Sequence, residues 1–187
     1  SIPNYVQEFG NEAFSGCVKL HSIDFADGQN LLSIGQYAFY NCSTLVSVTV
    51  PEGVQTLGAY AFYNNASLVK IKLPSTLSVI GNYAFGNCQQ LMKMNVAAYA
   101  PPTVSSNTFY NVPRTATVYV PESAINTYKS TYIWNEFFIE SNVQDALDNI
   151  FTDSEEQVQK LLIQGQVFII RNVKCYDLMG QEVKTEM

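Results

Sequence analysis

Hydrophobic residues recur along most of the chain at nearly constant steps. The clearest landmark is the dipeptide Ala-Phe, whose aromatic residue lies at Phe14, Phe39, Phe62 and Phe85, followed by a degenerate Thr-Phe at Phe109. The steps between these phenylalanines are 25, 23, 23 and 24 residues, and a glycine stands four residues before each of the first four. Such a period predicts a solenoid, in which each coil buries its apolar side against its neighbours.

The residues between two landmarks alternate between apolar and polar types. Ile71 and Leu73 are separated by a lysine, the pattern of a half-buried strand, and Pro74 stops this strand because proline cannot donate to a ladder. A second apolar pair, Leu77 and Ile80, leads to a glycine that permits a tight bend. We expect the Ala-Phe segment that follows to be a helical turn with its phenylalanine in the core.

A cap is expected after the last strand of the stack, because a terminal coil has no further neighbour to cover it. The alternation places this strand at residues 117–120, and residues 122–130 read as a short helix. Four aromatic residues follow, and we expect their rings to shield the open end of the stack from water: Tyr132, Trp134, Phe137 and Phe138.

One copy reads Leu-x-x-Ile-x-Leu-Pro-x-x-Leu-x-x-Ile-Gly-x-x-Ala-Phe-x-x-Cys over residues 68–88. This motif resembles the consensus of the BspA-like, or Treponema pallidum type, leucine-rich repeats of bacterial surface proteins. The resemblance covers roughly residues 2–142 and implies an α/β repeat solenoid of short strands and helical turns. The sequence departs from it at Asn65, where a cysteine is expected, by two extra residues within 27–30, and in the Phe109 copy, which lacks the alanine and the glycine.

From Val143 the repeat landmarks are absent, and the residues up to Glu156 are mostly polar and acidic. We therefore divide the chain into a leucine-rich-repeat solenoid with its cap, residues 1–142, and a linker with a small β tail, residues 143–187. The first part holds 6 Lys and Arg against 8 Asp and Glu, and the second holds 4 against 8. Glycine-containing turns within the tail predict a small β-meander with four strands at residues 158–163, 166–171, 174–178 and 181–184.

The end of the tail carries a second, shorter resemblance. Residues 176–183 read Tyr-Asp-Leu-Met-Gly-Gln-Glu-Val. This phrase is similar to the end of the C-terminal sorting-type tails on Bacteroidetes secreted proteins, which implies export or surface attachment. The chain begins at Ser1 without an initiator methionine or an apolar leader, as expected for a trimmed fragment.

Composition and charge exclude several classes of protein. Apolar residues make up 47% of the chain, enough for a large core, but no run approaches the roughly 18 residues that a membrane span needs. The 16 Asp and Glu outnumber the 10 Lys and Arg, giving a net charge of −6. Because a phosphate-binding surface needs a cationic excess, we do not expect nucleic acid as a partner.

Catalytic and metal-binding residues are scarce. His21 is the sole histidine, and we interpret it as a surface residue near a repeat-turn Cys17 rather than as half of a catalytic pair. Close cysteine pairs typical of zinc sites are absent, and the acidic residues within 145–156 lack the order of a calcium loop. We therefore predict that the protein is not an enzyme and holds neither metal nor cofactor. The sequence leaves open whether Cys17 and Cys42 form a disulfide, because successive coils lie about 5 Å apart, within the range that a disulfide spans.

Two polar columns repeat in register. We interpret the asparagine column as structural, with amides that satisfy backbone groups and each other at equivalent turns: Asn41, Asn64, Asn87 and Asn111. Tyr37, Tyr60 and Tyr83 favour an aromatic ladder on the coil surface. A part in ligand binding is the second interpretation of this ladder, since aromatic stripes on a regular array suit proteins or sugars.

The outward face of the strands is the candidate binding surface, because the exposed strand face of a solenoid commonly binds partners. Three of the six basic residues of the repeat region gather there. The predicted ligand-binding residues are Ser22, Asp24, Ser47, Thr49, Lys70, Lys72, Lys93, Asn95 and Tyr119. A merely solvated face is the alternative interpretation.

Two functions follow as hypotheses. The first is a non-enzymatic, extracellular or cell-surface interaction module, for which the resemblance implies adhesion to protein or glycan on host or neighbouring cells. The second is a structural spacer or scaffold of the cell envelope with no ligand of its own.

Overall fold

The computed structural model describes residues 5–23, 25 and 30–142, together with four strands of the tail at 158–163, 166–171, 174–176 and 182–183. The chain divides into two compact units, Ser1–Ser141 and Asn142–Met187. Each unit is described by itself.

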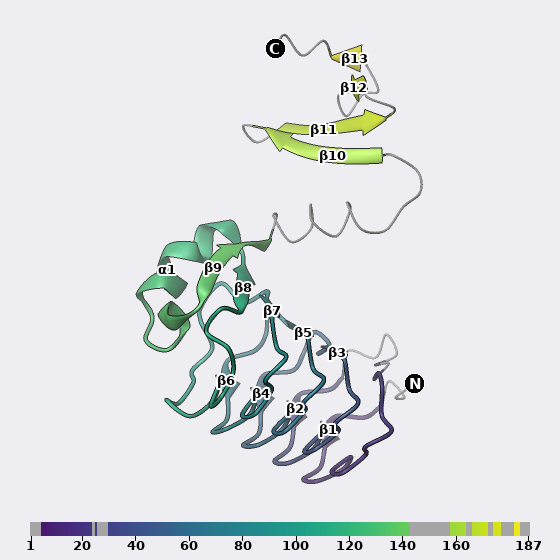
Figure 1. Ribbon diagram of the computed structural model, residues 1–187, viewed down its shortest axis with the longest axis vertical. Coiled ribbons are helices and arrows are strands. Elements are labelled where there is room, and N and C mark those ends of the chain that lie inside the picture. The colour runs from purple at the N-terminus through teal and green to yellow at the C-terminus, as the bar shows by residue number, and fades with distance from the viewer. Residues whose placement is uncertain are drawn as a thin grey trace. The chain divides into compact units, whose positions relative to one another are not determined.

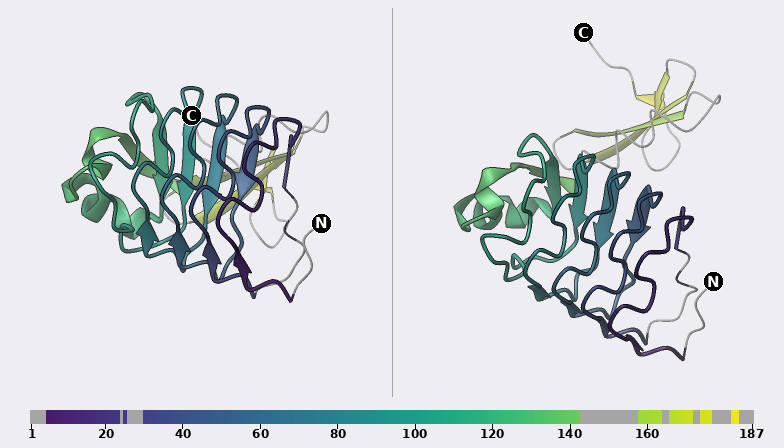
Figure 2. Two further views of the ribbon diagram at one scale, coloured as in Figure 1. Left: turned by 90° about the horizontal axis from the view of Figure 1, so that it is seen from below. Right: turned by 60° about the horizontal axis from the view of Figure 1, so that its bottom comes forward.

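Two parallel sheets run along the first unit, and each coil contributes one strand to each sheet in most of the stack (Figures 1 and 2). The first sheet has the order β1-β2-β4-β6, with strands Glu8–Phe9, Ser33–Ile34, Thr56–Leu57 and Val79–Ile80. The second has the order β3-β5-β7-β8-β9, with strands Ser47–Thr49, Lys70–Leu73, Lys93–Val96, Thr117–Val120 and Phe138–Ser141. The first unit is therefore a β-solenoid.

The Ala-Phe segments are turns and not helical turns, so the expected α/β character is wrong. Tyr37 and Asn41, on either side of Phe39, have φ of 56° and 57°, which a right-handed helix does not allow. The N–H of Phe39 donates to the carbonyl of Ala61 in the next coil (2.8 Å) rather than back along its own coil. Within the described residues up to Ser141, helix occurs only in the cap, as α1 (Ile125–Ser130) and the 3-10 turns η1 (Glu122–Ala124) and η2 (Trp134–Glu136).

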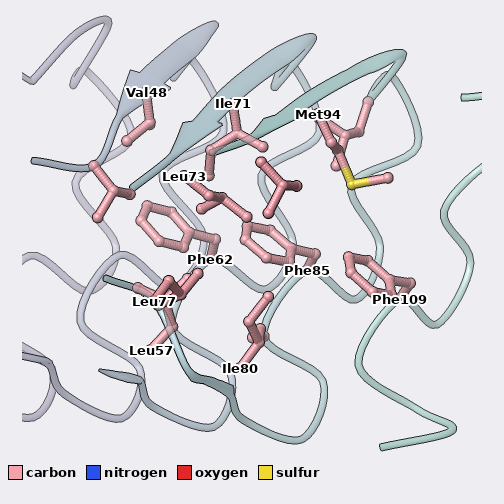
Figure 3. Packing of buried hydrophobic residues seen from close by; sticks show 14 of the residues in the cluster. Val48, Leu57, Phe62, Ile71, Leu73, Leu77, Ile80, Phe85, Met94 and Phe109 are labelled. Carbon is pink, nitrogen blue, oxygen red and sulfur yellow. The ribbon is translucent and has the colours of Figure 1, made fainter. Parts of the chain in front are cut away.

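A column of phenylalanine rings forms the centre of the core (Figure 3). Adjacent rings from Phe14 to Phe109 stack nearly parallel, with centroids 5.1, 5.2, 5.6 and 5.7 Å apart. The inward residues of the second sheet, such as Ile71 and Met94, cover one side of this column, and those of the first sheet, such as Ile80, cover another. The expectation that the repeat phenylalanines enter the core is confirmed.

The repeat glycines allow close contact between coils. A Cβ atom at Gly58 would lie 2.6 Å from the backbone nitrogen of Gln36, and Gly81 meets Ala59 in the same way at 2.5 Å. Neither Gly58 nor Gly81 has a positive φ. The glycine is thus needed for coil spacing rather than for the tight bend expected from the sequence.

The cap closes the stack with two of the four expected aromatic rings. Trp134 and Phe137 are buried and contact Phe109 edge to face, at 5.3 and 5.2 Å. The Trp134 Nε1–H donates to the carbonyl of Pro102 (3.0 Å), so the indole is buried without a lost hydrogen bond. Tyr132 and Phe138 are 71% and 60% exposed, so the expectation that they shield the stack is wrong.

The second unit contains a four-stranded sheet with the order β10-β11-β12-β13, whose strands are Val158–Ile163, Gln166–Arg171, Lys174–Tyr176 and Glu182–Val183. Neighbouring strands in this order pair antiparallel.

Candidate binding surface

The outward side chains of β3, β5, β7 and β8 form two rows across the second sheet. Register pairs join Ser47, Lys70, Lys93 and Thr117 in one row, and Thr49, Lys72, Asn95 and Tyr119 in the other. The residues between the rows point into the core, including Ile71 and Met94 (Figure 3). We call these eight outward residues the lysine face.

Three lysines occupy neighbouring positions on this face. Lys70 and Lys93 occupy paired positions on adjacent strands, whose backbones are about 4.8 Å apart, and Lys72 is two residues along β5. The face is therefore a local cationic patch on a chain whose net charge is −6.

Tyr119 departs from the expected row of exposed residues. It occupies the predicted position on β8, yet only 5% of its surface is exposed. The ammonium group of Lys93 lies 5.7 Å from the centroid of its ring, within the range of a cation–π contact. The structure thus gives Tyr119 a role in positioning Lys93.

The first predicted pair is described only in part: the carbonyl of His21, next to Ser22, accepts a hydrogen bond from the N–H of Val46 (3.3 Å). Ser22 is exposed but lies outside the strands, and Asp24 lies outside the described residues. Among the described strands, the candidate surface begins at β3, with Ser47 and Thr49.

Four apolar residues beside the lysine face were not expected from the sequence. Val46, Val69 and Met92 are 49%, 41% and 47% exposed, and each lies just before a strand of the second sheet. Phe138 on β9 pairs with Thr117 and continues its row. The sequence could have predicted the exposure of Val46, Val69 and Met92. Each is the second of two consecutive apolar residues before a strand, and only the first of the two can point into the core.

The asparagine column is structural, as the sequence predicts. The side-chain amide of Asn64 donates to Asn41 Oδ1 (2.8 Å), and that of Asn111 donates to Asn87 Oδ1 (3.1 Å). All four asparagines have φ between 57° and 61°, a conformation that asparagine tolerates better than most residues. Local geometry and contacts between coils therefore account for the column.

The ring of His21 and the thiols of Cys42 and Cys88 each form a hydrogen bond with a backbone carbonyl group. The Nδ1 of His21 lies 2.8 Å from the carbonyl oxygen of Lys19, so it acts as a donor there. Burial raises the pKa of Cys42 to about 11 and that of Cys88 to about 12, which keeps both thiols protonated at neutral pH. Cys17, Cys42 and Cys88 are free thiols.

The described residues contain neither a cluster of metal-ligating side chains nor a membrane-spanning helix. Within residues 5–23, 25 and 30–142 and the four tail strands, no three His, Cys, Asp or Glu side chains are grouped as a metal site requires. In the same part of the chain, no helix is long and apolar enough to cross a bilayer. The acidic residues of 145–156 lie outside the described residues.

Solved structures with this architecture come from several bacteria. A leucine-rich repeat protein of Treponema pallidum is 30% identical, with a TM-score of 0.54 over 60% of this chain and 51% of that one. A leucine-rich repeat protein of Bacteroides ovatus is 24% identical, with a TM-score of 0.55 over 75% of this chain and 36% of that one, and shows the same fold. The chain thus spans about half and about a third of their lengths. No curated protein matches the sequence.

The family model described as "BspA type Leucine rich repeat region" matches residues 1–112 and 55–177, with six copies. These matches agree with the stacked coils, the phenylalanine column and the repeat glycines. The protein is therefore a leucine-rich-repeat β-solenoid of about six turns, and it belongs to the BspA type leucine-rich repeat family.

Proposed function

We propose that this protein is a non-enzymatic, exported or cell-surface interaction module that adheres to protein or glycan on host or neighbouring cells. The observation that carries the proposal is the register of Lys70, Lys72 and Lys93 on one outward sheet face of an acidic chain. Membership of a family of repeat proteins typical of bacterial surfaces supports the proposed location.

The lysine face favours an anionic partner, such as a sulfated glycan or an acidic protein. Clustered cations attract such a partner from a distance, and salt weakens this attraction because it screens exposed charges. Val46, Val69 and Met92 add apolar contact area beside the lysines. We therefore expect binding that falls steeply with salt but retains a salt-resistant remainder.

The test is binding of the purified chain to extracellular matrix proteins, mucin and heparin at low and at physiological salt. A Lys70→Glu/Lys72→Glu/Lys93→Glu variant should lose at least about tenfold in affinity for any partner of the parent, because charge reversal replaces attraction with repulsion. Thermal unfolding followed by circular dichroism establishes that this variant is folded.

A matched control separates the lysine face from net charge. Lys19 and Lys129 are exposed and lie outside the second sheet. A Lys72→Glu/Lys93→Glu variant and a Lys19→Glu/Lys129→Glu variant change the net charge by the same amount. Equal losses of binding in the two would contradict the proposal, since the lysine face would then have no special role.

The spacer hypothesis is the second candidate, and the regular stack of coils favours it. Under the spacer hypothesis, substitutions over the whole lysine face leave surface adherence unchanged. A parent that binds none of the partners, on cells or purified, would give this hypothesis the lead.

We further propose that residues 1–142 form the interaction domain and that residues 143–187 form a linker and a β-meander ending in a sorting signal. The antiparallel order of β10 to β13 supports the meander. The test is surface labelling of a Bacteroidetes host that exports either the parent or a variant lacking residues 176–183. Equal labelling of the two would remove the proposed sorting role.

A further inference from the structure

A second surface of the solenoid carries no charge. The ten-residue turn segments at 35–44, 58–67, 81–90 and 104–113 contain no Asp, Glu, Lys or Arg. The surface made by these four segments, the turn face, is instead rich in tyrosine, asparagine, glutamine and serine. A neutral face over four successive coils is notable in a chain whose net charge is −6.

Six tyrosines form one continuous group on the turn face, which we call the tyrosine plate: Tyr37, Tyr40, Tyr60, Tyr63, Tyr83 and Tyr110. Rings from successive coils stack nearly parallel, with centroids 4.8, 5.1 and 5.6 Å apart. The two resulting rows meet edge to face at 5.6 and 5.4 Å, and Tyr110 joins the end of the plate at 5.7 Å. The stacking fixes the rings, so the plate presents rigid ring edges and hydroxyl groups to its surroundings.

Three of these tyrosines occupy backbone positions that suit other residues better. Tyr37, Tyr60 and Tyr83 have φ of 56°, 58° and 55°, a region that disfavours bulky side chains. Asparagine fills the other left-handed position of each of these turns. These three tyrosines thus adopt this backbone conformation at a local energetic cost.

The plate has the properties of a protein-binding surface. Tyrosine, serine and asparagine dominate antibody combining sites, because tyrosine provides a large contact area at a low cost in side-chain entropy. Charged residues are depleted at the centres of protein interfaces, as they are on the turn face. Prior ordering of the rings lowers the entropy lost on binding.

The spacing and charge of the turn face point to a second copy of this chain as the partner. The rings of the plate repeat with the period of the coils, and a second copy presents rings with the same period. Two copies, each with net charge −6, repel one another, and contact through an uncharged face adds no further charge repulsion at the interface itself. We propose that two copies associate plate to plate about a two-fold axis, as a self-complementary interface requires.

The interface is small, so the dimer is weak and depends on concentration. Four coils at about 4.8 Å per coil make the face shorter than a standard protein interface. Because the contact involves no ion pairs, salt leaves the dimer unchanged or strengthens it by screening the repulsion between the two acidic chains. This behaviour is opposite to that expected for ligands of the lysine face.

Sedimentation equilibrium of the full chain over a wide concentration series tests the proposal. The parent is expected to rise from the mass of one chain, 20.8 kDa, toward twice that value, at low and at high salt. Tyr110→Lys, which puts a charge at a 52% exposed position of the plate, should weaken the dimer at least about tenfold.

Two further variants complete the design. Tyr132→Lys makes the same change at a 71% exposed tyrosine outside the plate and should dimerise like the parent. The Lys72→Glu/Lys93→Glu variant should also dimerise, so the outcome is independent of the proposed function. Circular dichroism melts establish that each variant is folded.

Three results would overturn the proposal: a parent that stays monomeric at every concentration, a dimer that Tyr110→Lys does not weaken, or a dimer that high salt dissociates. A monomeric parent that instead binds the neutral polysaccharides laminarin or mannan, with binding lost in Tyr110→Lys, would assign the plate to a glycan.

Discussion

At the scale of single residues, one repeat position shows two solutions to the same requirement. Cys42 and Cys88 each donate from Sγ to a phenylalanine carbonyl of the preceding coil, both at 3.2 Å. Asn65 holds the equivalent position and donates from Nδ2 to the carbonyl of Phe39 (2.9 Å). Its Oδ1 is buried and accepts no hydrogen bond from the described residues. The departure from the repeat consensus thus preserves the donor but buries an extra acceptor.

Asn65→Cys should therefore stabilise the protein. The change keeps a donor and removes a buried acceptor, which should raise the free energy of unfolding by about 1 kcal/mol. The reciprocal change, Cys88→Asn, should lower it by a similar amount. Urea unfolding followed by circular dichroism measures both, and an Asn65→Cys variant less stable than the parent would contradict the interpretation.

The buried thiols predict how stability depends on alkaline pH. Burial raises the pKa of Cys88 to about 12 and that of Cys42 to about 11, from a value of 9.0. Above pH 9.0 the unfolded chain therefore loses these protons before the folded chain does, so stability falls as pH rises toward 11 to 12. Urea unfolding on either side of pH 9 should show a smaller loss for Cys88→Ala than for the parent. Equal losses would show that Cys88 does not contribute.

At the scale of elements, the sequence predicts long, alternating or aromatic elements well. The strands at 70–73 and 117–120 and the buried ring of Trp134 follow directly from alternation and composition. The first sheet was not foreseen as strands, because its members have two residues each, too few for an alternating pattern. The positive φ at the Ala-Phe turns could not be predicted from the sequence either, because tyrosine rarely adopts a φ near 56°.

The candidate site was predictable only in part. Alternation placed Lys70, Lys72 and Lys93 on one face, and the sheet register confirms that they share it. The burial of Tyr119 depends on its neighbours and not on strand alternation. The contribution of Phe138 depends on β9, which follows an irregular cap and has no repeat landmark.

The repeat glycines give the sharpest test of coil spacing. Gly58→Ala should lower the free energy of unfolding by about 2 to 4 kcal/mol, because its Cβ would meet the backbone of the preceding coil at 2.6 Å. Gly10→Ala is the matched control, since a Cβ there has nothing within 4 Å. Thermal melts of the two variants should differ clearly, and similar melts would mean that the coils can separate to accommodate a methyl group.

At the scale of the whole solenoid, each coil contacts only its neighbours, so stability is the sum of coil and interface contributions. The cap is therefore a separate contribution at one end. The Tyr128 hydroxyl donates to the carbonyl of Ala98 (2.9 Å), and Trp134 donates to Pro102, so side chains of the cap bind backbone groups of the segment before Phe109.

Trp134→Ala should unfold the solenoid from its cap. Loss of the buried indole should cost about 3 to 5 kcal/mol locally. Hydrogen exchange should accelerate first in α1 and β9, while the amides of β2 and β4 keep their protection. Uniform acceleration along the stack would instead indicate that all the coils unfold together.

The hydrogen bonds of the turns give the stack a direction. Tyr37 and Tyr60 donate their N–H groups to Ala59 and Asn82, each in the next coil. In these turns, each coil therefore presents N–H groups to the next coil and carbonyl groups to the preceding coil. An internal duplication of residues 56–78 would insert a coil whose hydrogen-bonding groups already match those of its neighbours. Such a duplication would lengthen the lysine face and the tyrosine plate together by one coil. Unequal genetic exchange could therefore change the length of both binding surfaces without altering the contacts between coils.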